Sequence, residues 1–560
     1  MGIKLSQSFN LKMICLVGIF LFGFLLRLDG LRSRGYEYDE VWTYQHYVNI
    51  PVKDIFSELS TPNNHPLNSF FMKYSTAVFG VTPLGMRFPA FFAGVLLMFI
   101  IPLTVYIAFR DLDVSVFSGA MVAFNGALIH YSQTARGYSM QTLLVSLFIL
   151  HALRLSGRRG GRWDCYFLWL FPVLSILTLS TSILYVFPVS LIHFLFIVRR
   201  NWSSDGGWRE KVVGMLRVDI GVFVSYFILG GFVLFWYIHN YAAFRAGQYF
   251  GSSLDTLGTF ALFIKDTLSR LSNPCFWVLC FPVVFYRRWR FLFGVFLFSI
   301  LFPFVLAFFT QAGPPRVYIP ILIYLFIVAG KSCSLILRHF VKGAFPRDIV
   351  LVVISILFFV EGKREMRIWT PFDWGVVYPK IEDAFPQRFF ICYPPAAGLS
   401  IFANHLGRSI VGNIQRIPLG GDCGFVVAGN WPGGVCVPKS RAISVRNIAG
   451  TPCRIYNLKR IYPSSLEGAR GSLPKERMLF AFIRPNSYGR TVELKQYLAD
   501  ALPGAWMCCN PWFARSVYTE SQRKVIALAL ICDIGSNVEC DTVASLMEEL
   551  RGEVFFYAIE

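Results

Sequence analysis

Charge is scarce in this sequence. Asp, Glu, Lys and Arg make up only 15% of the 560 residues, whereas hydrophobic residues make up 55% and aromatic residues 17%. Water-soluble, fibrous and disordered proteins have more polar or more repetitive compositions, so these classes are excluded. The mean hydropathy is +0.52, and apolar runs long enough to cross about 30 Å of hydrocarbon recur along the first two thirds of the chain. The sequence therefore predicts an integral membrane protein.

Acidic residues are the scarcer charged kind. The 33 Asp and Glu residues oppose 53 Lys and Arg residues, which gives a formal net charge of +20. Such an excess of base can indicate nucleic-acid binding. Here much of the base forms short clusters between apolar runs, as in loops held at the cytoplasmic face by anionic lipid headgroups. We therefore expect contact with membrane lipids and no nucleic-acid partner.

No small-residue cleavage site follows the first apolar run, Met13–Leu28, so a removed signal peptide is not indicated. We interpret this run as a retained helix with a cytoplasmic N-terminus. Further spans are predicted at 86–109, 114–130, 138–154, 165–180, 183–198, 219–238, 272–286, 291–310, 317–335 and 346–361. About eleven transmembrane helices would place the C-terminal region on the outer face.

The charges of the connecting loops test this orientation. The loops that the count assigns to the cytoplasm contain the basic clusters of 154–162, 199–217, 287–290 and 331–347. The alternate loops carry less base, as the positive-inside rule requires. The link Arg110–Asp113 is the weakest point, because it has no net excess of base.

Residues 362–560 have a different composition from the membrane module of residues 1–361, and they predict a water-soluble domain on the outer face. Met478–Ile483 and Val554–Ile559 have strand patterns, and Thr491–Leu502 and Thr542–Leu550 have helix patterns, so an α/β or α+β domain is expected.

This domain is also rich in cysteine. Eight of the 13 cysteines belong to it, namely Cys392, Cys423, Cys436, Cys453, Cys508, Cys509, Cys532 and Cys540. That enrichment suits an oxidising compartment. No Cys-x-x-Cys pair or Cys/His spacing indicates a zinc site, and disulfides and buried thiols both remain open.

The first outer loop, about residues 29–66, is long and polar. Its carboxylates Glu37, Asp39 and Glu40 fall within four residues, directly beyond a membrane span. Such a cluster offers a general base with an adjustable pKa. A solvated acidic loop is the alternative interpretation.

Other polar and aromatic residues lie where the chain leaves the membrane on the same outer side. They are His65, Arg87, Arg136, Tyr138, Arg245, Arg316 and Tyr318. Singly, Arg and Tyr at such places are typical of interfacial anchors. Together with the acidic loop they predict a pocket with one base and several phosphate-binding groups, as transfer from a phosphorylated lipid requires.

The order of these motifs resembles the GT-C glycosyltransferases. The motifs are Asp-Glu at 39–40, His-Pro at 65–66, Arg-x-Pro at 87–89, Tyr-Ser-Gln-x-Ala-Arg-x-Tyr at 131–138 and Arg-x-Tyr-x-Pro at 316–320. The likeness is greatest to the branch of protein O-mannosyltransferases, bacterial aminoarabinose transferases and rhizobial galacturonosyltransferases, and it covers about residues 10–360. It implies a GT-C-like membrane fold in a bacterial inner membrane, with a periplasmic domain after it.

The resemblance also implies a reaction, which is inverting transfer of a hexosyl or pentosyl group from a polyprenyl-phosphate sugar donor to lipid A, another glycan or a protein. Asp39 matches the family's base, and Glu40 matches a neighbouring carboxylate that orients the acceptor or the base. His65 matches a His/Lys-Pro position near the donor phosphate.

Two further motifs of the family contribute donor-binding groups. Arg316 and Tyr318 match its late Arg/Tyr element, which contacts the phosphate or the sugar. Arg136 and Tyr138 match its motif between the third and fourth spans. Thr134 stands where an acidic residue is often seen, so the sequence gives no second carboxylate at that place.

The sequence also lacks a Walker-type or dinucleotide-type Gly-rich loop. Nucleotide sugars are not available outside the cytoplasmic membrane, so a lipid-linked donor is the economical choice. Departure of a monophosphate assisted by fixed cations requires no obligatory metal. We therefore predict no metal site and no required cofactor, while a divalent cation stays open because oligosaccharide-transferring relatives use one.

Two other classes of protein remain as alternatives. A multi-pass transporter or lipid flippase for an anionic substrate would also need many helices and outer cations, and Pro188, Pro282 and Pro303 offer helix breaks for it. A non-catalytic receptor or scaffold would use the outer domain for binding.

Overall fold

The computed structural model describes residues 7–369 except 34–36, 58, 60–63, 158–159, 203–207, 243–256, 287–289 and 310–312. Beyond 369 it describes eight strands and residues 545, 548 and 549. The chain divides into two compact units, Met1–Ser33 with His46–Pro371 and Arg34–Gln45 with Phe372–Glu560.

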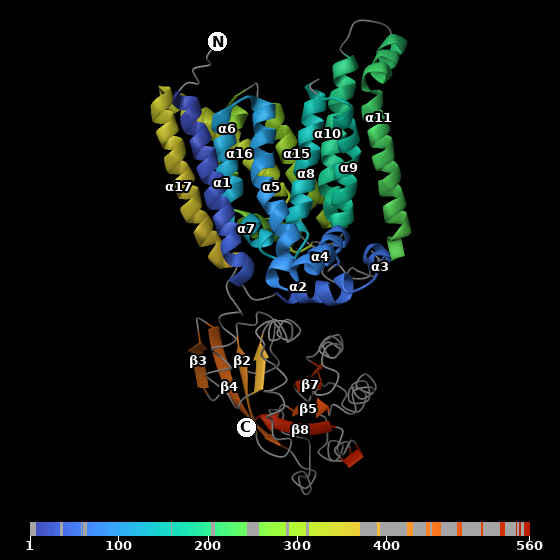
Figure 1. Cartoon of the computed structure of the whole chain (residues 1–560), viewed down its shortest axis with the longest axis vertical. Helices are drawn as coiled ribbons and strands as arrows, with labels where there is room; N and C mark the ends of the chain where they lie inside the picture. The colour runs from blue at the N-terminus through green and yellow to red at the C-terminus, as the bar shows by residue number, and fades with distance from the viewer. Residues whose placement is uncertain are drawn as a thin grey trace. The chain divides into compact units, whose positions relative to one another are not determined.

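The first unit is a helix bundle (Figure 1). Its longer helices are α1 (Gln7–Ser33), α4 (Pro66–Phe79), α5 (Pro83–Phe109), α6 (Leu112–Phe124), α8 (Tyr138–Ser156), α9 (Arg162–Thr178), α10 (Ile183–Trp202), α11 (Trp208–His239), α13 (Leu257–Leu271), α15 (Arg290–Phe309), α16 (Ile321–Phe340) and α17 (Ala344–Trp369). The short helices of the chain are α2 (Tyr38–Thr43), η1 (Tyr44–Val48), α3 (Val52–Ser57), α7 (Gly126–Ser132), η2 (Ser180–Ser182), α14 (Pro274–Val278), η3 (Phe281–Phe285) and η5 (Pro315–Tyr318).

The bundle exposes large apolar side chains on its surface and buries charged ones beside its apolar core. Phe227 and Phe285 are each 83% exposed, whereas Arg27 and Arg87 are fully buried. Such exposure of large apolar side chains is unusual for a water-soluble protein and suits a surface in contact with hydrocarbon. Within the described residues, six helices are long and apolar enough to cross a membrane, or up to eight if each of two bent helix pairs is one span. The chain is therefore a multi-pass helical membrane protein, and the number of eleven spans stays a prediction.

Two of the predicted spans are wrong as single helices. The predicted span 114–130 consists of α6 and α7, which meet at an angle of 57°. The predicted span 272–286 begins where α13 ends, and it consists of the short helices α14 and η3 after a bend of 105°. The sequence pattern thus missed α13 and placed one continuous helix where the chain turns.

An asparagine accounts for each of these breaks. Asn125 Oδ1 accepts a hydrogen bond from the backbone N–H of Leu128 at 3.0 Å. Asn273 Oδ1 accepts one from the backbone N–H of Cys275, also at 3.0 Å. A side chain that caps the next helix in this way favours a new helix start over continuation of the old one.

The middle of the bundle is tightly packed. Ser118 Oγ of α6 donates to the carbonyl of Phe326 in α16 at 2.9 Å, and a Cβ atom at Gly330 would collide with the same hydroxyl.

The first and last helices of the bundle, α1 and α17, lie side by side (Figure 1), with the rings of Phe22 and Phe359 5.7 Å apart.

Ion pairs join α1, α6, α16 and the link before α6, near the start of α1. Asp111 Oδ2 lies 3.3 Å from Lys331 Nζ, and its Oδ1 lies 2.7 Å from Arg338. Asp113 lies 2.6 Å from Lys12 and 3.2 Å from Arg338. The acids of the link between α5 and α6 thus pair with bases from other helices, so the lack of excess base in that link does not contradict the predicted orientation.

The second unit contains an eight-stranded sheet. Its strands are β1 (Phe389–Cys392), β2 (Cys423–Ala428), β3 (Ser444–Ile448), β4 (Thr451–Arg460), β5 (Leu479–Ile483), β6 (Trp506–Met507), β7 (Ala527–Cys532) and β8 (Val554–Ile559). The strand order is β1-β2-β4-β8-β5-β7-β6, with β3 paired to β4. Only β1 and β2 pair in parallel among the described strands.

The two strands predicted in this region correspond to β5 and β8, which are neighbours in the sheet. The predicted helix 491–502 and most of 542–550 lie outside the described residues, so the α/β or α+β class stays a prediction. The division of the chain at residue 361 also stays a prediction; the helix α17 that contains this residue continues to Trp369.

Candidate functional site

A buried histidine begins the candidate site. His65 directly precedes α4, whose first residue is Pro66, a residue suited to a helix start because its fixed φ is already helical. Asn64 holds this turn in place, because its Nδ2 donates to the carbonyl of Ile55 at 2.8 Å and its Oδ1 accepts from Ser69 at 3.2 Å. His65 is only 1% exposed, so its ring is fixed inside the protein.

The contacts of the ring define its tautomer. His65 Nδ1 accepts a hydrogen bond from the backbone N–H of Gly137 at 2.8 Å. Burial, and then the charges of Arg136 and Arg316, hold the pKa of His65 well below its ordinary value of 6.5. The ring is therefore neutral, and its one proton lies on Nε2. Nε2 has no hydrogen-bond partner among the residues that the structure describes, which leaves it as a donor for a ligand.

Gly137 is required by this close approach. A Cβ atom at this position would lie 2.7 Å from His65 Nδ1 and 2.8 Å from Thr178 Cγ2. Any larger residue would push the loop away from the imidazole. Gly137 lies inside the motif at 131–138, but its role was missed because the spacing of the motif gives no indication of a contact with residue 65.

Tyr138 is the centre of the site. Its ring meets His65 edge-on at 5.0 Å and Tyr131 at 4.8 Å. Its hydroxyl accepts a hydrogen bond from Arg316 Nε at 3.1 Å, and the guanidinium carbon of Arg136 lies 5.9 Å from its ring centroid. The structure thus brings together four of the predicted residues, His65, Arg136, Tyr138 and Arg316, and adds Tyr131.

These residues come from segments far apart in the sequence, at the start of α4, at the start of α8 and in η5. Helices α4 and α7 lie at the end of the bundle opposite the N-terminus (Figure 1). Two guanidinium groups, a hydroxyl and a neutral N–H donor can bind an anion that presents several oxygen atoms, and phosphate is the common biological case.

Tyr318 is near this cluster in sequence but has other contacts. Its ring stacks on Phe304 at 5.0 Å and meets Phe263 edge-on at 5.6 Å. Burial raises the pKa of Tyr318 to about 12. Since Tyr185 also donates to the carbonyl of Val317 at 2.7 Å, these aromatic residues hold η5 in place. The predicted contact of Tyr318 with a donor stays a prediction.

The remaining predicted cations are Arg87 and Arg245. Arg87 Nη1 donates to the carbonyl of Leu31 at 3.3 Å, near the end of α1. Its full burial next to a helix end is what a cap of that helix requires. Arg245 lies outside the described residues.

The predicted carboxylates belong to the second compact unit. Glu40 is fully buried, and its Oε2 accepts a hydrogen bond from the backbone N–H of Glu37 at 2.7 Å. This is the reach of a third-position Glu back to the residue that caps its helix, here α2, so Glu40 stabilises the helix on which Asp39 lies. The roles of Asp39 and Glu40 in a reaction stay predictions.

Within the part of the chain that the structure describes, no group of three or more His, Cys, Asp or Glu side chains is placed to hold a metal ion. The donor set around Tyr138 is cationic or neutral, which suits an anionic ligand and not a metal.

Comparison with known proteins gives structural likeness only. No family model and no curated protein sequence matches the chain. ArnT from Cupriavidus metallidurans in the apo state has a TM-score of 0.44 and 13% identity, over 80% of this chain and 97% of that one. The same ArnT bound to undecaprenyl phosphate has a TM-score of 0.42 and 13% identity.

A second protein is similar over nearly the whole length. The oligosaccharyltransferase of Archaeoglobus fulgidus in the apo form has a TM-score of 0.41 and 11% identity, over 98% of this chain and 88% of that one. Because all three TM-scores are below 0.5, these likenesses assign no activity to the chain.

Proposed function

We propose that the protein is a membrane glycosyltransferase that moves a sugar from a polyprenyl-phosphate carrier to a lipid, glycan or protein acceptor. The convergence of Arg136, Arg316, His65 and Tyr138 at one end of an apolar helix bundle supports this proposal most strongly. Cations and neutral donors suit the phosphate of the carrier. The apolar helices around them suit its lipid chain.

The reaction follows from where negative charge grows. The acceptor oxygen bonds to the anomeric carbon while the bond from that carbon to the phosphate oxygen breaks, and the electron pair stays on the departing phosphate. Fixed donors that face this phosphate stabilise the transition state more than the ground state. Arg316 supplies charge, and neutral His65 supplies an N–H without any change of its own protonation.

The base is proposed from the family resemblance. Asp39 takes the proton of the acceptor hydroxyl as the bond forms, a contribution of about 10²–10⁴-fold. Glu40 orients the acceptor or the base. Attack from the side opposite the phosphate inverts the configuration at the anomeric carbon. No step needs a metal, so we expect transfer to continue in EDTA.

The membrane location and topology are likewise proposed from the family resemblance and the loop charges. The chain lies in a bacterial inner membrane with a cytoplasmic N-terminus, eleven spans and a periplasmic domain after residue 361. Lipid A, another glycan or a protein then serves as acceptor in the periplasm.

The test is sugar transfer from a panel of synthetic polyprenyl-phosphate sugars, with native membrane extract as the source of acceptor. Release of polyprenyl phosphate is measured for purified wild-type protein, Asp39→Asn and Asp54→Asn in detergent. Asp54 is a matched control because it is a carboxylate of α3 in the same loop. We expect release by wild type and Asp54→Asn but not by folded Asp39→Asn.

The other outcomes each remove part of the proposal. Equal release by wild type and Asp39→Asn removes Asp39 as base. No release from any donor of the panel by any form of the protein rejects sugar transfer.

The broken spans favour a second candidate, a transporter or lipid flippase for an anionic substrate. Discontinuous helices are typical of transporters, and the breaks at Asn125 and Asn273 are of this kind. Pro188 and Pro303 contribute no break, because they lie inside the continuous helices α10 and α15. Movement of a fluorescent polyprenyl phosphate across proteoliposomes without sugar transfer would support this candidate.

A further inference from the structure

The two breaks in the bundle meet at one carboxylate, that of Glu365 in α17. Its Oε2 accepts a hydrogen bond from the backbone N–H of Gly126, the first residue of α7, at 2.9 Å. Its Oε1 accepts one from the backbone N–H of Asn273, just before α14, at 3.0 Å. Asn125 Nδ2 donates to the carbonyl of Leu271, the last residue of α13, at 2.9 Å. One side chain therefore joins the α6/α7 break to the α13/α14 break.

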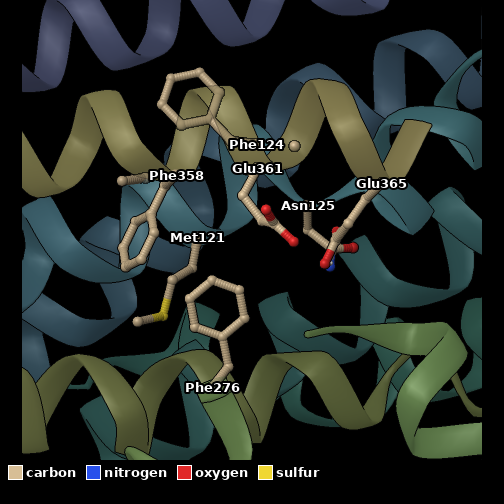
Figure 2. A pocket seen from close by; sticks show the side chains of 9 residues that line it. Met121, Phe124, Asn125, Phe276, Phe358, Glu361 and Glu365 are labelled. Carbon is tan, nitrogen blue, oxygen red and sulfur yellow. Dashed lines mark hydrogen bonds between the residues drawn. The ribbon is translucent and has the colours of Figure 1, made fainter. Parts of the chain in front are cut away.

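Figure 2 shows this meeting point, with the carboxylates of Glu361 and Glu365 on the α17 side and the Asn125 side chain beside Glu365. Glu361 Oε1 accepts only from the side chain of Asn273 in the described contacts, at 2.8 Å. Met121 and Phe276, together with Phe358 of α17, line a cavity of about 10 Å³ beside these carboxylates, with room for about one water molecule.

Small residues let α17 come this close. A Cβ atom at Gly126 would lie 2.5 Å from Glu365 Cβ. A Cβ atom at Gly362 would collide with the carbonyl oxygen of Phe124. On the other side of the break, Arg27 of α1 donates to the carbonyls of Val122 and Ala123 at 3.0 and 2.8 Å. The end of α6 and the start of α7 are thus fixed by charged groups of opposite sign.

The two breaks that Glu365 joins lead to the two halves of the cationic cluster. α7 runs from Gly126 to Ser132 and continues into the loop with Arg136, which ends at Tyr138. α13 packs against η5, which carries Arg316, through Phe263 and Tyr318. The two halves meet where Arg316 donates to Tyr138.

We propose that Glu365 is a positioning residue, whose carboxylate sets the separation of the Arg136–Tyr138 segment from the Arg316 segment. Both carboxylate oxygens are needed, because each accepts from a different break. Loss of the side chain removes both of these bonds, leaves the bond from Asn125 to the Leu271 carbonyl between the two breaks, and widens the cluster. The effect on ligand binding rests on the proposed function, whereas the effect on the two segments does not.

The experiment compares Glu365→Ala and Glu365→Gln with wild type and with Asp266→Asn. Asp266 is a matched control, because it is an exposed carboxylate of α13 paired only with Arg270 in the described contacts. Hydrogen exchange of the full-length protein in nanodiscs is read at residues 133–138 and 313–318, with α16 as internal reference. Binding of undecaprenyl phosphate is measured on the same samples.

We expect exchange to rise in both segments of Glu365→Ala while α16 keeps the wild-type rate, and undecaprenyl phosphate to bind about 10- to 100-fold more weakly, as for a misplacement of about 1 Å. Glu365→Gln keeps one good acceptor, so it should recover part of both effects. Asp266→Asn should behave as wild type.

Two outcomes overturn the proposal, namely unchanged exchange in either segment, or a rise that extends equally to α16 and so reports general destabilisation. Looser segments with unchanged or absent binding of undecaprenyl phosphate would support the positioning role and count against the lipid-phosphate ligand.

Discussion

The neutral state of His65 predicts a pH dependence of stability that a single substitution should remove. The unfolded chain titrates this residue at an ordinary pKa of about 6.5, whereas burial holds the folded pKa well below that value. Between these two values the unfolded state binds more protons than the folded state, so the free energy of unfolding falls as the pH falls. Above the unfolded pKa the contribution of His65 to the free energy of unfolding does not change with pH.

The size of the effect follows from proton linkage. Between pH 7.5 and pH 5.5, protonation of His65 in the unfolded state should lower the free energy of unfolding by about 1.4 kcal/mol. The reason is that pH 5.5 lies about one unit below the unfolded pKa, which favours the protonated unfolded state by a factor of about ten. In His65→Gln the amide oxygen can still accept from Gly137, and nothing at this position titrates. His339→Gln is the matched control, since His339 is an exposed residue of α16.

The assay is unfolding by SDS in mixed micelles at the two pH values, followed by tryptophan fluorescence. Wild type and His339→Gln should lose about 1.4 kcal/mol more than His65→Gln on acidification. An identical loss in wild type and His65→Gln would refute the reasoning, because it would mean that His65 is protonated in the folded state or that its ring does not accept from Gly137.

Two further substitutions test the cluster and the opposite end of the bundle. Arg316→Lys keeps the charge but loses the forked geometry and the bond to Tyr138, at a cost of about 1.5–3 kcal/mol, so kcat/KM for the donor should fall about 10- to 150-fold. Arg347→Lys, at a half-buried position near the start of α17, is the control. Equal kcat/KM values for Arg316→Lys and wild type would exclude a contact specific to Arg316. Asp111→Asn leaves Lys331 buried without its full countercharge and should lower the free energy of unfolding by about 3 kcal/mol. The same SDS titration measures this change. A loss below about 0.5 kcal/mol would show that the Asp111–Lys331 pair is hydrated.

Much of the bundle could be predicted from hydropathy alone. The predicted spans 86–109 and 138–154 correspond to α5 and α8 within a few residues, because a run of apolar residues needs no tertiary context to be recognised. The breaks were harder to predict. Asn125 and Asn273 cap new helices, but a single Asn in an apolar run is equally compatible with a continuous helix.

The candidate site was predicted only in part, because motifs identify residues but not the contacts that helix packing gives them. The motifs predicted which residues gather at one end of the bundle, and four of them meet in the described structure. No motif indicated that Arg87 bonds to the end of α1 or that Tyr318 packs among phenylalanines, because both contacts depend on how helices pack. Glu365 was missed because it lies beyond the predicted last span and outside every motif.

The adjacency of α1 and α17 has a consequence for biosynthesis. The first and last helices of the bundle supply Arg27 and Glu365, which fix the two sides of the break before α7. During translation, α1 enters the membrane more than three hundred residues before α17, so throughout that interval α7 lacks its final contact. The cluster around Tyr138 can therefore take its finished form only when the whole membrane part has been inserted, and a chain truncated before α17 would be left with an unfinished site.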